Sequence, residues 1–169
     1  MMKTRYKTVL PALITALFFL SACDQQATNS DNINRPRVTF EPNIHNKQFG
    51  KYLVHINALT TDQLPTEVAR AYKISRSKNR AMLNVSIREK SAAGETPITA
   101  DISVIAKNLN NQLKNTKLRE IKETDPVAIY YIGELPVGNE ETIVFDLDVT
   151  PSGSSQPLFL SYRQQFFTE

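Results

Sequence analysis

Apolar and polar residues alternate with a period of two along much of this 169-residue chain, and this pattern limits its fold more than any other feature. Such alternation is typical of strands that bury one face and expose the other. It is clear in residues 52–59, 81–88, 98–106 and 143–149. The sequence therefore predicts that strands make up most of the folded part.

Further segments complete the expected set of strands. Val127–Ile132 is apolar on both parities, so we expect a central strand that is covered on both sides. Further strands are expected at residues 38–40, 117–122 and 158–167. Residues 93–97, 125–126, 136–139 and 151–154 are rich in Gly, Pro and Asn and are expected to form turns.

Only one helix is clearly predicted. Leu64, Val68 and Tyr72 are spaced four residues apart and share a helical face, and Pro65 suits a first turn. A second possibility lies between Ile105 and Leu113, but the asparagines there are equally compatible with a loop or short turn.

This set of elements predicts a mainly all-β fold. About seven to eight short strands with one small helix favour an antiparallel, immunoglobulin-like β-sandwich. A closed small barrel is the alternative, because the pattern does not count sheets. Residues 37–169 are expected to form a single β-sandwich domain, which is long enough to bury a core of its own.

The N-terminal segment has the order of a secretory signal. Cations at Lys3, Arg5 and Lys7 precede an apolar stretch over residues 9–20, which is shorter than the roughly 20 residues that span a bilayer. The run that ends at Cys23, the only cysteine, resembles the lipobox of bacterial lipoproteins. This resemblance implies that residues 1–22 are a lipoprotein signal peptide and that fatty acids such as palmitate are attached to Cys23.

The residues after Cys23 bear on localisation. Asp24 and Gln25 resemble the signal that retains lipoproteins in the inner membrane. The resemblance implies a protein anchored to the cell membrane by lipid and facing the periplasm, with the inner membrane favoured over the outer membrane. Residues 23–36 are polar and are expected to form a disordered tether; an ordered edge strand is the alternative.

Removal of the signal changes the charge balance. The chain has 20 basic and 17 acidic residues, and three of the basic ones lie in residues 1–22, which leaves 20 − 3 = 17 basic against 17 acidic. A mature chain of zero net charge lacks the basic excess typical of nucleic-acid-binding proteins, so we expect no nucleic acid partner.

Three segments are distinctive in sequence: residues 49–55, 68–86 and 128–132. Together they resemble a family of exported proteins of Gram-negative bacteria, the domain of unknown function 4426 family. The similarity covers roughly residues 40–167. It implies export and a single compact domain, and it implies no activity, substrate or catalytic residue.

The strongest candidate for a binding surface is basic. Six cations, which we call the basic cluster, follow one another closely: Arg70, Lys73, Arg76, Lys78, Arg80 and Arg88. If the strand over residues 81–88 begins early, the last four share its outward face and form one positive strip. The alternatives are a solvated edge that cations protect from strand pairing, and salt bridges to the acidic C-terminal half.

Other titratable residues give weaker signals. Asp146 and Asp148 are expected on one exposed strand face, where carboxylates do not acquire the divergent pKa values of an acid–base pair. His45 and His55 are the only histidines, too few for a well-supplied transition-metal site. We therefore predict no catalytic residue, no metal site and no cofactor.

The sequence predicts a lipid-anchored envelope β-sandwich that acts as a binding or assembly module, with another envelope protein as its possible partner. A small envelope enzyme with an unrecognised site and a structural spacer are the alternatives. A pocket that joins His55 to Asp146 or Asp148 would favour the enzyme.

Overall fold

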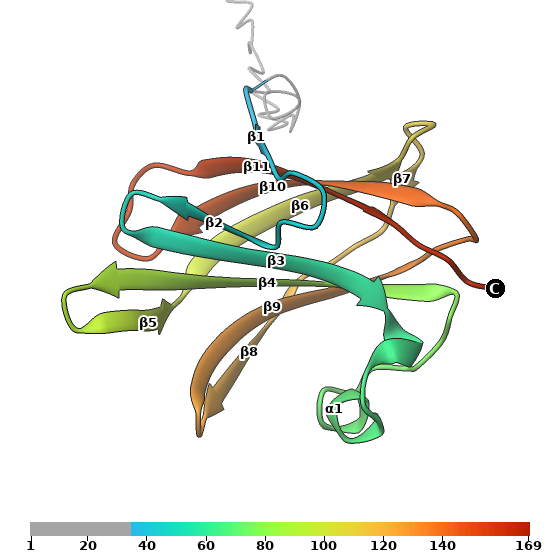
Figure 1. The fold of residues 1–169 in the computed structure, drawn as a ribbon, viewed down its shortest axis with the longest axis horizontal. Helices are drawn as coiled ribbons and strands as arrows, with labels where there is room; N and C mark the ends of the chain where they lie inside the picture. The colour runs from blue at the N-terminus through green and yellow to red at the C-terminus, as the bar shows by residue number, and fades with distance from the viewer. Residues whose placement is uncertain (1–34) are drawn as a thin grey trace, which may run out of the picture. The chain divides into compact units, whose positions relative to one another are not determined.

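Eleven strands in two sheets make up most of the computed structural model, which describes residues 35–169 (Figure 1). Sheet A has the order β1-β11-β10-β6-β7, and its strands are β1 (Val38–Thr39), β11 (Leu158–Gln165), β10 (Thr142–Pro151), β6 (Ala100–Asn108) and β7 (Leu113–Lys114). Sheet B has the order β2-β3-β4-β9-β8, and its strands are β2 (Asn46–Phe49), β3 (Tyr52–Thr60), β4 (Arg80–Ser91), β9 (Val127–Pro136) and β8 (Arg119–Thr124). A short strand, β5 (Gly94–Ile98), pairs with β4 beside this path.

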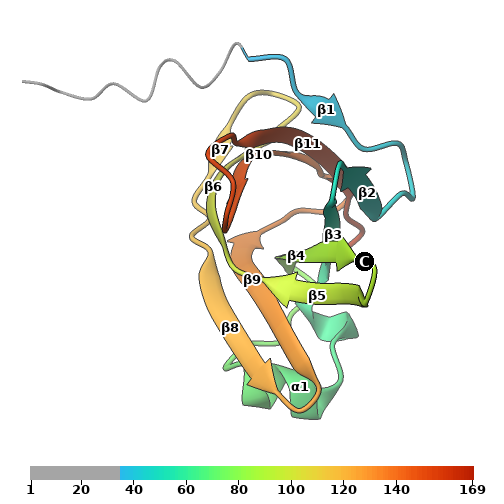
Figure 2. The same cartoon turned by 90° about the vertical axis from the view of Figure 1, so that its left-hand side faces the viewer.

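The two sheets face each other, as Figure 2 shows, which confirms the predicted β-sandwich. Every strand pair is antiparallel except β1 with β11. The apolar side chains of the predicted alternation fill the space between the sheets. On β10, Ile143, Phe145, Leu147 and Val149 are fully buried, and Val54, Leu83 and Val85 meet them from sheet B.

A second, smaller core lies on the outer face of sheet B. The 3-10 turn η2 (Thr61–Gln63) and the helix α1 (Thr66–Ala71) follow β3 and cover this end of the sheet. Leu64, Ala69 and Ile74 of this segment pack with Met82 of β4 and Ile132 of β9. Cover on both faces explains why the sequence of β9 is apolar on both parities, as predicted.

The structure adds three strands that the sequence did not predict. β2 is a polar edge strand, and β7 has only two residues. β5 occupies residues expected to form a turn, and its Pro97 is tolerated because β5 is hydrogen-bonded to one neighbour only. Between Ile105 and Leu113, where a helix and a loop or short turn were both possible, the structure has the turn, because β6 continues to Asn108 and a turn follows.

Candidate functional site

The anchor residues predicted from sequence, Cys23, Asp24 and Gln25, lie outside the described residues. Within residues 35–169, no helix is both long and apolar enough to cross a membrane. The tether predicted over residues 23–36 reaches the described chain only at its last two positions.

The structure does not join the basic cluster into one strip. β4 begins at Arg80, so Arg76 and Lys78 lie in the loop before it, and Arg70 and Lys73 belong to α1 and its C-terminal end. Arg80 and Arg88 are eight residues apart on β4, which separates them by roughly 26 Å. The early strand start on which the strip depended is not found, because β4 begins at Arg80, and a binding role for these cations stays a prediction.

Two members of the basic cluster have acidic partners, and one of these partners, Glu134, belongs to the acidic C-terminal half that one alternative named. The Nε atom of Arg80 lies 2.9 Å from a Glu134 carboxylate oxygen on the neighbouring strand β9. The Nε atom of Arg88 lies 3.4 Å from a Glu95 carboxylate oxygen on β5. Both pairs are partly exposed, so their contribution to stability is small.

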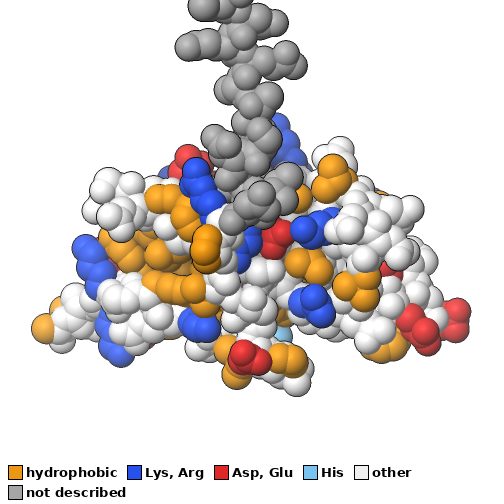
Figure 3. Space-filling view, turned by 90° about the horizontal axis from the view of Figure 1, so that it is seen from above, with side chains coloured by type: hydrophobic (Ala, Val, Ile, Leu, Met, Phe, Trp, Pro, Cys, Tyr) orange, Lys and Arg blue, Asp and Glu red, His pale blue; other side chains and the backbone are white. Residues whose placement is uncertain are grey.

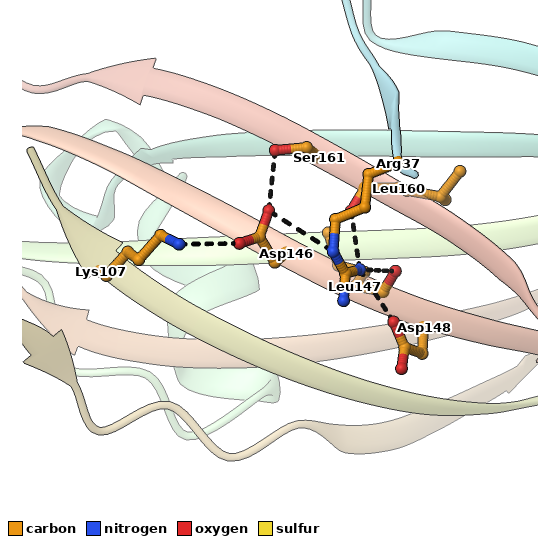
Figure 4. A network of polar contacts seen from close by, with 7 residues as sticks. All are labelled: Arg37, Lys107, Asp146, Leu147, Asp148, Leu160 and Ser161. Carbon is orange, nitrogen blue, oxygen red and sulfur yellow. Dashed lines mark hydrogen bonds and ion pairs between the residues drawn. The ribbon is translucent and has the colours of Figure 1, made fainter. Parts of the chain in front are cut away.

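Asp146 and Asp148 lie in a network of charged groups on the outer face of sheet A, shown in Figure 4. Arg37, which directly precedes β1, donates hydrogen bonds from Nη1 to Oδ1 of Asp148 (2.8 Å) and to the carbonyl oxygen of Leu147 (2.9 Å). Lys107 Nζ lies 3.2 Å from Oδ2 of Asp146. We call Arg37, Lys107, Asp146 and Asp148 the polar network.

The polar network covers a face that was expected to be open. The side chains of Asp146 and Asp148 are each only 16% exposed, because Arg37 lies across both of them. The hydroxyl of Ser161 also donates to Asp146 Oδ1 at 2.8 Å. The charges of two carboxylates and two cations balance one another within the network. The network therefore fastens the start of the domain to sheet A.

The histidines belong to a different place, a hollow of about 240 Å³ on sheet B. His55 and Asn57 come from β3, Asn84 comes from the adjacent position on β4, and His45 precedes β2. The side-chain oxygen of Asn84 is buried and has no hydrogen-bond partner among residues 35–169. We call this feature the polar hollow.

His55, Asn57 and Asn84 provide the polar hollow with neutral hydrogen-bonding groups. Burial, with the nearby Arg88 cation, lowers the pKa of His55, so its imidazole is uncharged at neutral pH. The ring of His45 is held by a contact of 3.2 Å between its Nδ1 and the hydroxyl of Tyr162. Imidazole and amide groups give the hollow both donors and acceptors.

The structure does not bring His55 together with the two aspartates. His55 lies on the outer face of sheet B, whereas Asp146 and Asp148 lie on the outer face of sheet A. Among residues 35–169, no group of three or more His, Cys, Asp or Glu side chains is placed to hold a metal ion. The arrangement provides a hydrogen-bonding surface and a fastening point, on opposite sides of the sandwich.

Sequence reasoning missed Arg37, Lys107 and Asn84. Arg37 contacts residues 110 and 111 positions away, so no local pattern indicates it. Asn84 had a usable signal, because it faces Asn57 directly across the β3–β4 pair and both are polar at outward positions.

Comparison with known proteins identifies the family. The model of the family described as domain of unknown function (DUF4426) matches residues 46–169. The chain belongs to this family. A crystal structure of a DUF4426 family protein from Pseudomonas aeruginosa has the same fold, with a TM-score of 0.62 and 28% identity, and the match covers 73% of this chain and 94% of that one.

Other comparisons add little. A family 123 glycoside hydrolase from Clostridium perfringens is similar over 69% of this chain and 28% of its own, with 9% identity and a TM-score of 0.30, which is too low to support an argument. No curated protein matches the chain. Membership of the DUF4426 family therefore establishes the fold and leaves the activity open.

Proposed function

We propose that this DUF4426 protein is a lipid-anchored component of the bacterial cell envelope whose β-sandwich faces the periplasm and binds another envelope protein. The N-terminal sequence supports the anchor, since a cationic start and a short apolar stretch lead to Cys23. Asp24 and Gln25 support the inner membrane as its location. The polar network supports a tethered arrangement, because it fastens the first described residues to sheet A.

The polar hollow is the observation that carries the binding role. A buried carbonyl oxygen without a hydrogen bond costs about 1–3 kcal/mol. Asn84 lines the hollow, and the terminal torsion of asparagine is broad, so rotation of its amide would allow a donor from a partner to satisfy this oxygen. The uncharged His55 and the amide of Asn57 suit the backbone and amide groups of a protein partner.

Crosslinking in intact envelopes tests the binding role. Replacement of His55 and Asn84 by alanine removes the donor and acceptor groups at the centre of the hollow, and should remove the crosslinked partner. The control is Lys122→Ala, an exposed position on β8, which is separated from β3 and β4 in sheet B by β9 and which should leave the partner unchanged. An identical set of crosslinked proteins from the double variant and the parent would rule out the hollow as the contact.

The basic cluster is tested in the same way. Charge reversal at Arg76, Lys78 and Arg80 tests whether these cations take part in the contact. If charge reversal removes the partner while the hollow variant retains it, the binding surface lies at the basic cluster instead.

Fractionation tests the anchor. Acyl chains contribute about 0.8 kcal/mol per buried methylene, and two chains or more are needed for stable retention. Cys23→Ser should therefore release the protein from the membrane or leave its signal uncleaved. Normal processing with unchanged membrane retention would contradict the anchor.

A further inference from the structure

The turn over residues 108–113, which joins β6 to β7, exposes two leucines. Leu109 is 61% exposed and Leu113 is 74% exposed. Single exposed leucines are common on protein surfaces, so exposure alone indicates little. The construction of this turn and the face on which it lies are more informative.

Asn108 holds this turn in shape, although it is only 8% exposed itself. Its Oδ1 accepts hydrogen bonds from the backbone N–H groups of Asn110 (3.1 Å) and Gln112 (3.0 Å). Its Nδ2 donates to Gln112 Oε1 (2.7 Å) and to Glu141 Oε1 (3.0 Å). The turn is thus fixed from within by polar groups, and both leucines are presented to the outside.

The turn lies on the same side of the domain as the beginning of the described chain. Leu113 is paired with Lys107, whose Nζ contacts Asp146 on the outer face of sheet A, and directly paired residues point to the same face. Figures 1 and 2 both show the loop between β6 and β7 and the beginning of the described chain projecting beyond sheet A. Arg37, near that beginning, lies on the same face.

Exposed cations on this face, beside the charge-balanced polar network, can contact a bilayer surface. Arg35 and Arg163 are exposed there, and Figure 3 shows hydrophobic side chains and lysine or arginine side chains next to one another on the face. Cations attract anionic lipid headgroups, and apolar side chains enter the layer below them.

We propose that residues 108–113 form a second membrane contact, in which Leu109 and Leu113 insert into the interfacial layer of the bilayer. This inference rests on the proposed lipid anchor, because two leucines bind a membrane only weakly. The predicted tether over residues 23–36 spans roughly 20 Å, so it keeps this face at a high effective concentration near the lipid. The membrane contact orients the domain and turns the polar hollow on sheet B toward the periplasm.

Fluorescence quenching on vesicles tests the contact, since the chain contains no tryptophan and a single one is a clean reporter. Leu113→Trp is made in the acylated protein, which is reconstituted into vesicles of phosphatidylethanolamine and phosphatidylglycerol with brominated acyl chains. The matched control is Val127→Trp, which is 63% exposed at the β8–β9 turn, on the side of the domain away from the β6–β7 loop in Figures 1 and 2. This control also accounts for the affinity of tryptophan for interfaces.

The proposal predicts that brominated lipid quenches Leu113→Trp at least about twofold more than Val127→Trp. Adding Leu109→Asp to Leu113→Trp should abolish the difference. Flotation with the vesicles but equal quenching of both reporters would overturn the second contact and leave the anchor intact. Failure to float would overturn the anchor and the second contact together. Shielding of Leu113→Trp in native envelopes without quenching in pure vesicles would assign the turn to a protein partner instead, and would also overturn the proposal.

Discussion

Replacing Arg37 with alanine removes the central cation of the polar network. Its guanidinium donates to the Leu147 carbonyl and the Asp148 carboxylate, and the arginine side chain is only 10% exposed. Hydrogen bonds with a charged partner contribute about 1.5–3 kcal/mol each, or about 3–6 kcal/mol for two. Fixing the long arginine side chain costs about 2 kcal/mol. We therefore expect Arg37→Ala to lower the free energy of unfolding by about 1–4 kcal/mol.

Urea denaturation monitored by far-UV circular dichroism measures this loss, and hydrogen exchange locates it. The backbone N–H of Phe40 donates to Ser161 across the β1–β11 edge, so its exchange should accelerate when Arg37 is lost. Arg163→Ala, an exposed change on the same face, should stay within about 0.5 kcal/mol of the parent. A loss below about 0.5 kcal/mol in Arg37→Ala, with unchanged exchange at Phe40, would refute the role of the network.

Three further changes test other parts of the fold. Burial and a hydrogen bond to a carboxylate raise the pKa of Tyr131 to about 12, so the stability it contributes is complete below pH 10 and is lost as the pH rises to about 12. In urea denaturation at a series of pH values, Tyr131→Phe should make the free energy of unfolding fall less steeply over this range. An unchanged pH dependence would contradict this role of Tyr131. Although burial opposes its charge, three hydrogen bonds lower the pKa of Glu141, so its contribution to stability is present above pH 4.5 and is lost as the pH falls through the lowered value. Glu141→Gln should therefore weaken the loss of unfolding free energy at acid pH. The same loss in the variant and the parent would count against a role for these hydrogen bonds. A Cβ atom at Gly133 would lie 2.8 Å from Thr116 Cγ2 and 2.9 Å from Leu118 Cδ2. Gly133→Ala should therefore lower the free energy of unfolding, measured by urea denaturation, by about 1–3 kcal/mol. Unchanged stability would mean that both side chains move aside.

The architecture was largely predictable from sequence because its main strands bury one face. On β3, β4 and β10 the parity of apolar residues matches the parity of burial, as at Val54, Leu83 and Phe145. The polar edge strand β2 shows no such parity, since its side chains are exposed or half-buried. β5 contains Gly94 and Pro97, which indicate a turn when they are considered alone.

The candidate sites were less predictable because long-range pairing creates them. Asp146 and Asp148 have the parity of an exposed face, and they are covered only because Arg37 arrives from the other end of the chain. Likewise, the grouping of Arg76 and Lys78 with Arg80 depended on where β4 begins, and the pairing with β9 starts only at Arg80. Local sequence patterns report burial by the sheet and carry no information about such distant partners.

Mass spectrometry of the mature N-terminus, from protein purified out of its native membrane, tests the central claim most directly. We expect the first residue to be Cys23 with fatty acids attached, at the mass of a chain that lacks residues 1–22. A mature chain that starts at another residue, or that starts at Cys23 without a fatty acid, would contradict the anchor.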